Sequence, residues 1–317
     1  MTWFRPLALD AEKEPARPRW GPVFWADLGT LFCLSLLAAT LPIAQITVVR
    51  EIGLWLGLFF WLARMYLAGK WEFLRTPLDL PLALLLLAGI ISVFTSGEPG
   101  TAFDQIKGEM VKWILIYYLA VNNLRTERRA LVFFGALFAG AVVMDVYGLY
   151  YFFTHGGSLT RSILRLASLH AGSPQFGDYL IQTAPYIAVG ALWLRSPRWK
   201  VALALLLAIH AFVLYLTFGR MDLWVFVLEA LLILYLTRSN WKALALVILV
   251  GFLVLFIFSP RPVVVLGKKA PAGQVLPQVG VHGLKGSRLL VWKTGWAYLR
   301  EHPFTGIGFG RHMFGRK

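Results

Sequence analysis

The segment Leu216–Trp224 reads LTFGRMDLW and lies between two apolar stretches. These stretches, at about 199–217 and 221–237, are each close to the ~20 residues that an α-helix needs to cross a bilayer. Because the connection is so short, the chain must reach one membrane surface at Arg220 and turn back at once. The segment therefore predicts a helical hairpin that carries a guanidinium group at its tip.

The rest of the chain is as apolar as this hairpin. Hydrophobic residues make up 58% of the sequence and charged residues 15%, whereas about a quarter is charged in an average soluble domain. Cys33 is the single cysteine, so no intrachain disulfide can form. We predict an all-α fold, a polytopic transmembrane helical bundle with about nine spans, at 23–43, 46–67, 78–95, 108–121, 130–153, 178–194, 199–217, 221–237 and 241–258.

The basic residues are distributed unequally between the two sides of this bundle. Fifteen Lys and Arg residues fall in the N-terminal tail and the even-numbered gaps, and six fall on the opposite side up to the ninth span. By the positive-inside rule the N-terminus is cytoplasmic. The expected parts are a cytoplasmic tail (1–22), a transmembrane domain (23–258) and the incomplete start of a periplasmic loop with an amphipathic helix (259–317). Topology thus explains most of the +15 net charge, and we expect no nucleic-acid partner.

Two arginines lie on the side that has few basic residues. Arg161 and Arg165 are one helical turn apart, and Leu159, Ile163 and Leu166 fall on the opposite face at helical spacing. This pattern predicts a short interfacial helix. The two charges have two interpretations, contact with phospholipid headgroups or a site for a phosphate-bearing ligand.

Arg220 is expected at the same outer surface, where the eighth span begins. A helix N-terminus presents unpaired N–H groups and the positive end of the helix dipole, so an arginine beside it favours an anion. The sixth span begins in a similar way, with Ser173 as a possible N-cap and Pro174 at its first position. The alternative is that Arg220 pairs with Asp222.

The segment GSRLLVWKTGWAYLREHP, residues 286–303, predicts a further helix outside the membrane. Ser287 is a possible N-cap, and Pro303 ends the helix at about His302. Arg288 lies at its start. An apolar stripe at helical spacing consists of Leu289, Trp292, Trp296 and Leu299.

Several short motifs in this order resemble the O-antigen ligase and polymerase superfamily of bacterial inner-membrane glycosyltransferases. They are T-x-x-R at Thr217–Arg220, an outer R…P stretch that opens a span, S-R-x-x-x-W at Ser287–Trp292 and HPFTGIGFG at 302–310. The resemblance implies a multi-pass helical bundle with a large periplasmic loop. It also implies transfer of a glycan from an undecaprenyl-pyrophosphate carrier to an acceptor hydroxyl, such as that of lipid A–core, without metal or cofactor. Membrane lipids are the remaining expected partner.

The resemblance also implies roles for individual residues. Arg220 and Arg288 would hold the pyrophosphate, with Arg165, and Arg161 beside it, as weaker candidates. The family's general-base histidine follows the glycine-rich turn, so we expect it beyond Lys317 and interpret the chain as an N-terminal fragment, inactive alone. His312 is a weak candidate for this base, and His302 is expected to be structural. The sequence departs from the family at Gly219, where serine is usual.

The sequence is also compatible with three other functions or states: a polymerase, a small-anion transporter and an inactive remnant. A polymerase uses the same donor as a ligase and differs in its acceptor. A small-anion transporter would need polar groups inside the membrane, and Asp145, His210 and Glu229 lie within predicted spans. The alternative is that these three side chains pair within the bundle. An inactive remnant is a further possibility.

The predicted topology can be tested by cysteine labelling in a Cys33→Ala background. Cysteines at positions 161 and 220 and in 259–317 should react with an impermeant maleimide added outside. Cysteines at 125, 198 and 238 should react only after the membrane is opened, because these positions carry the cytoplasmic positive charge. Labelling of 125 and 198 from outside would reverse the orientation.

Overall fold

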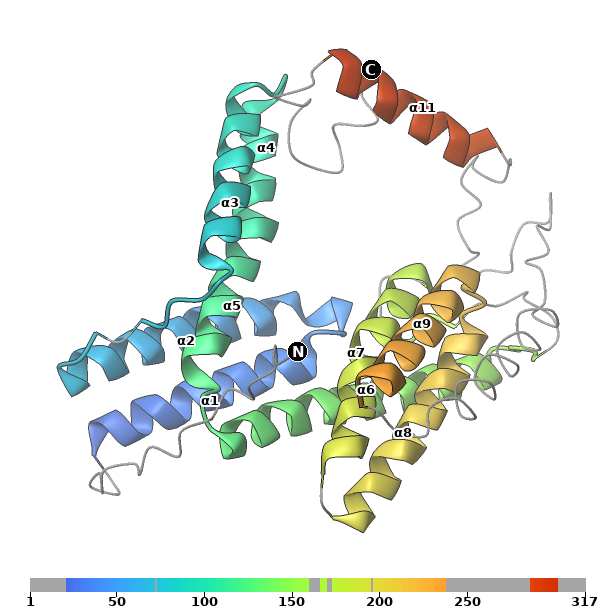
Figure 1. Ribbon diagram of the computed structural model, residues 1–317, viewed down its shortest axis with the longest axis horizontal. Helices are drawn as coiled ribbons and strands as arrows, with labels where there is room; N and C mark the ends of the chain where they lie inside the picture. The colour runs from blue at the N-terminus through green and yellow to red at the C-terminus, as the bar shows by residue number, and fades with distance from the viewer. Residues whose placement is uncertain are drawn as a thin grey trace. The chain divides into compact units, whose positions relative to one another are not determined.

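A computed structural model describes residues 21–71, 73–159, 166–169, 173–194, 196–237 and 286–301. All regular structure in these ranges is helical, so the all-α prediction is confirmed there (Figure 1). The elements are α1 (Pro22–Thr40), the 3₁₀-helix η1 (Ala44–Ile46), α2 (Thr47–Ala68), α3 (Asp79–Phe94), α4 (Pro99–Gln105), the π-helix η2 (Ile106–Val111), α5 (Lys112–Asn123), α6 (Glu127–Thr154), α7 (Ser173–Trp193), α8 (Pro197–Leu216), α9 (Arg220–Thr237) and α11 (Gly286–Glu301).

Four of the described helices, α1, α2, α6 and α8, are long and apolar enough to cross a membrane. Helix α3 is apolar but has 16 residues, and α9 contains three charged residues, Arg220, Asp222 and Glu229. The ninth predicted span, 241–258, and the loop residues 259–285 lie outside the described residues. The chain is a membrane protein with helices at most of the predicted positions, whereas the count of nine spans stays a prediction.

The fourth predicted span differs from the structure. Instead of one helix over 108–121, helical structure runs from Pro99 to Asn123 through α4, η2 and α5, with a π-helical turn in the middle. A π-helix places an extra residue in one turn and so shifts the side chains that follow. Met110 of this turn is buried, and its Cε would lie 2.5 Å from a Cβ atom placed at Gly89 on α3. Hydropathy averaged over a window does not register such a local change of pitch.

The described helices form two compact units, residues 1–31, 56–129 and 278–317 in the first, and 32–55 and 130–277 in the second. In the first unit a single acidic side chain joins three elements. The Asp27 carboxylate accepts a hydrogen bond from Arg64 Nη1 at 2.7 Å and forms a second ion pair with Arg129. A carboxylate among apolar helices is costly unless it is paired, so these two arginines account for its place there.

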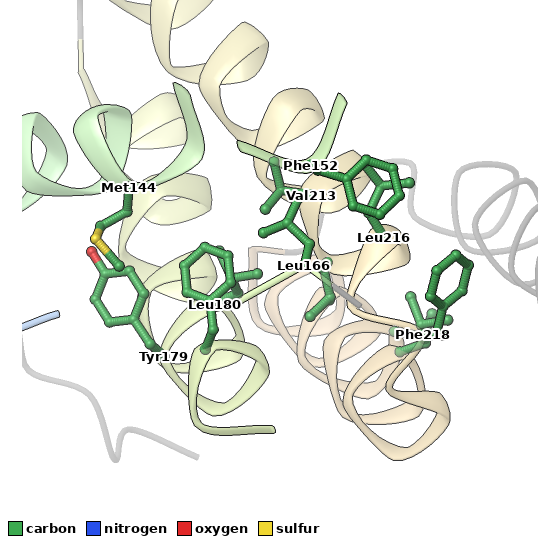
Figure 2. Close-up of a cluster of buried hydrophobic side chains, with 12 residues drawn as sticks. Met144, Phe152, Leu166, Tyr179, Leu180, Val213, Leu216 and Phe218 are labelled. Carbon is green, nitrogen blue, oxygen red and sulfur yellow. The ribbon is translucent and has the colours of Figure 1, made fainter. Parts of the chain in front are cut away.

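In the second unit α7 packs against both α8 and α9, as Figure 1 shows. A cluster of buried side chains fills the space between these helices and α6 (Figure 2). It consists of Met144, Phe152, Leu166, Phe176, Tyr179, Leu180, Val213, Leu214, Leu216, Phe218, Leu223 and Val227. This cluster reaches from the middle of the helices to the turn between α8 and α9, so the packing of the unit extends to that turn.

Helices α1 and α6 approach closely at Gly140. A Cβ atom placed there would lie 2.5 Å from the backbone carbonyl oxygen of Ala39. Small residues permit such close approach of helices in membranes, where packing takes the place of the hydrophobic effect. Gly140 is therefore a packing position and not a flexible one.

Gly140→Ala should lower the stability of the protein in detergent by about 1–3 kcal/mol, because the added methyl group forces the two backbones apart. The control is Gly135→Ala on the same helix, where an added Cβ atom meets nothing within 4 Å. Alanine there should be neutral or stabilising. Thermal unfolding of the purified protein measures both, and equal midpoints for the two variants would contradict the close contact.

Candidate functional site

The turn between α8 and α9 is held in place by its own side chains. The Thr217 hydroxyl is fully buried, donates to the carbonyl of Leu214 at 2.7 Å and accepts from the N–H of Gly219 at 3.2 Å. Phe218 has a φ of 52° and is 3% exposed. A left-handed conformation is unfavourable for a bulky residue and persists where the surrounding packing requires it. The turn is thus a fixed element of the fold.

This turn places Arg220 at the first residue of α9, as the sequence predicts. The N–H groups of the first turn of a helix have no partner within that helix, and the positive end of its dipole lies there. Arg220 is half-buried, and it adds a full positive charge to the first residue of this helix. This combination favours the binding of an anion.

The beginning of α7 lies beside the beginning of α9. Helix α7 starts at Ser173, and Gly177 in its second turn contacts the carboxylate of Asp222 in the first turn of α9. Two helix N-termini are therefore adjacent in this unit. The side chains of Ser173 and Pro174 are outside the described residues, so the predicted N-cap stays a prediction.

The sequence predicts a short interfacial helix before α7, and the structure differs from it at both ends of that segment. Leu159 lies in a bend, and Leu166 is not helical. Leu166 is buried in the core, and its N–H donates to the carbonyl of Leu216 at 3.2 Å. Ser168 then donates to the carbonyl of Met144 at 2.7 Å. Residues 166–168 are anchored on α8 through the Leu166 N–H and on α6 through the Ser168 hydroxyl, which helical periodicity alone does not reveal.

The other predicted site residues are placed less completely. Arg161 and Arg165 lie outside the described residues, as do His302 and His312. Arg288 lies in the first turn of α11, within the other unit, and nothing is described of its side chain. Helix α11 itself is confirmed, and the described members of its apolar stripe, Trp292, Trp296 and Leu299, are exposed. The assignment of all four arginines to a pyrophosphate stays a prediction.

A buried polar chain connects three helices deeper in the same unit as Arg220. Asp145 Oδ2 on α6 lies 2.8 Å from His210 Nδ1 on α8, and His210 Nε2 lies 2.8 Å from Thr183 Oγ1 on α7. The exposed fractions of these three residues are 0%, 1% and 3%. Sequence reasoning identified Asp145 and His210 as intramembrane polar groups, and the structure shows that they pair with each other.

Glu229 is not part of this chain. Its Oε2 atom is buried and has no hydrogen-bond partner among the described residues. Within the same residues, no group of three His, Cys, Asp or Glu side chains is placed to hold a metal ion. The polar chain joins α6, α7 and α8, and Arg220 at the beginning of α9 stays the predicted anion-binding residue.

Thr183→Val tests the polar chain with little change in shape. Valine removes the hydroxyl partner of His210 Nε2 and leaves that nitrogen only the longer contact with the Leu180 carbonyl at 3.2 Å, and the loss of one such hydrogen bond costs about 0.5–1.5 kcal/mol. The variant should unfold at a lower temperature in detergent than Thr183→Ser, which keeps the hydroxyl group. If valine is as stable as serine at this position, the contact does not stabilise the protein.

Comparison with known proteins identifies a family for the part of the chain that contains Arg220. Residues 201–317 match the family model described as O-antigen ligase. The match contains most of α8, the Thr217–Gly219 turn, Arg220, and α11 with Arg288. Searches of curated proteins and of solved structures found no match. This match confirms the resemblance noted in the motifs: residues 201–317 are similar to the O-antigen ligase family.

Proposed function

We propose that this protein takes part in glycan transfer on the periplasmic side of a bacterial inner membrane. The donor is a glycan on an undecaprenyl-pyrophosphate carrier, and the acceptor is a hydroxyl group of lipid A–core or a similar glycan. The observation that carries the proposal is the place of Arg220, at the first residue of α9 and within the range that matches the O-antigen ligase family.

The chemistry of the donor explains the value of an arginine there. When the bond between the sugar and the pyrophosphate breaks, negative charge accumulates on the leaving diphosphate. Preorganised cationic donors directed at such developing charge are commonly the largest single contribution to catalysis. An arginine also offers two parallel N–H groups to a phosphate, which fixes its orientation. Arg288, Arg165 and Arg161 are the further residues that the resemblance proposes for binding the diphosphate.

The acceptor hydroxyl needs a base, and a histidine suits this role at neutral pH. His210 is ruled out by its burial and its contacts with Asp145 and Thr183. His155, at the end of α6, stacks on the ring of Tyr151 with its Nδ1 atom 3.0 Å from the Tyr151 carbonyl oxygen. These contacts give His155 a role at the helix end. The base proposed from the resemblance is a histidine after the glycine-rich turn.

Two alternatives use the same helices differently. A polymerase of the same superfamily would transfer the same donor to a growing glycan, and the choice depends on the acceptor. A small-anion transporter would use polar groups near the membrane midplane. The pairing of Asp145 with His210 favours a structural role for these two groups over transport.

Arg220→Ala should weaken the binding of undecaprenyl pyrophosphate to the purified protein. The loss of a hydrogen bond to a charged group costs about 1.5–3 kcal/mol, or roughly a 10- to 150-fold rise in Kd. Arg288→Ala should act in the same direction. Lysine at either position should rescue binding only in part, since it lacks the planar fork.

Arg198→Ala provides the control for these variants. Arg198 is an exposed arginine at the opposite end of α8 from Arg220, so its loss should leave the Kd unchanged. The unfolding temperature shows whether Arg220→Ala is folded. If the folded variant binds the diphosphate as tightly as Arg198→Ala does, Arg220 is not part of the diphosphate site.

A further inference from the structure

The carboxylate of Asp222 occupies a space that two glycines leave open. A Cβ atom placed at Gly177 on α7, or at Gly219 before α9, would collide with Asp222 Oδ2. At Gly219 the added atom would also lie 3.3 Å from Thr217 Oγ1. The side chain of Asp222 therefore lies directly against the backbone of α7 and against the turn that precedes its own helix.

Steric space, and not backbone conformation, explains these two glycines. Neither has a positive φ, so any L-residue could adopt the backbone conformation found at either position. A glycine inside a helix costs about 0.5–1 kcal/mol relative to alanine, so Gly177 needs a compensating contact. The contact with Asp222 provides one, because the carboxylate could not lie there beside any larger residue.

The location also suits a negative charge. Asp222 is the third residue of α9, where an acidic side chain can reach back toward the start of its helix and interacts favourably with the helix dipole. The early turns of α7 lie against the same carboxylate, and their dipole has the same sign there. Shape and electrostatics thus favour the same position for this side chain.

We propose that Asp222 is a positioning residue for Arg220. By filling the space above Gly177 and Gly219, it holds the beginning of α9 against α7 and so fixes the guanidinium group two residues earlier. That this guanidinium group holds a diphosphate rests on the function proposed above. Thr217 and Phe218 fix the turn from within, and Asp222 fixes it to the neighbouring helix.

The test is a cycle of Gly177→Ala, Asp222→Ala and the double variant, with Gly135→Ala as the matched control. Two quantities are measured on the full purified chain, the Kd for undecaprenyl pyrophosphate and the midpoint of thermal unfolding. Gly177→Ala displaces the carboxylate, so we expect the Kd to rise about tenfold, which corresponds to roughly 1.4 kcal/mol. Gly135→Ala should leave the Kd unchanged, since its Cβ atom meets nothing within 4 Å.

The decisive comparison is between single and double variants. With alanine at 222 the added methyl group at 177 has room, so Gly177→Ala should cause no further rise in Kd and no further fall in the midpoint. Asp222→Asn keeps the shape of the side chain and should bind within about twofold of the parent. A purely stabilising role would lower the midpoint of the alanine variants and leave their Kd at the parent value.

The inference is overturned if Gly177→Ala binds like Gly135→Ala, or if the effects of the two substitutions add. Failure of the proposed function gives a different result. In that case Arg220→Ala leaves the Kd unchanged, whereas the unfolding midpoints still show the coupling between 177 and 222. That result would confirm the contact between α7 and α9 and would show that Asp222 does not position a phosphate-binding arginine.

Discussion

The buried carboxylate of Asp145 is the constraint on which the second unit depends. An unpaired carboxylate among membrane-embedded helices is costly, so α6, α7 and α8 must keep the arrangement in which His210 pairs with Asp145 and Thr183 meets the other side of the imidazole. Rotation of any one of these helices would break a contact. Hydrophobic packing alone permits sliding among similar side chains, whereas a polar contact has a single correct register.

The order imposed by this polar chain extends to the surface where Arg220 lies. The buried cluster shown in Figure 2 continues from Met144, next to Asp145, to Leu216 and Phe218 in the turn. The turn then starts α9 at Arg220, and Asp222 connects that start to α7. An arginine that binds a diphosphate must have a fixed position, because electrostatic stabilisation depends on preorganised charge. A polar interior and a packed turn together provide this fixed position.

Much of this arrangement could be predicted from local sequence. Apolar runs located the helices, and the short connection LTFGRMDLW located the start of α9 at Arg220, since both are properties of neighbouring residues. The pairing of Asp145 with His210 joins residues 65 positions apart, and no periodicity encodes it. No local sequence pattern predicts the contact of Asp222 with Gly177 either. The π-helical turn at 106–111 is likewise not predicted by the pattern of apolar residues. Gly219 is explained by the Asp222 carboxylate beside it, which leaves no room for a Cβ atom.

A structure of the protein with undecaprenyl pyrophosphate bound would show whether Arg220 binds the diphosphate. The measured quantity is the distance from the diphosphate oxygens to the Arg220 guanidinium nitrogens. We expect charge-assisted hydrogen bonds of about 2.7–2.9 Å, with the diphosphate at the beginning of α9. A diphosphate bound elsewhere, with Arg220 beyond hydrogen-bonding reach, would contradict this expectation.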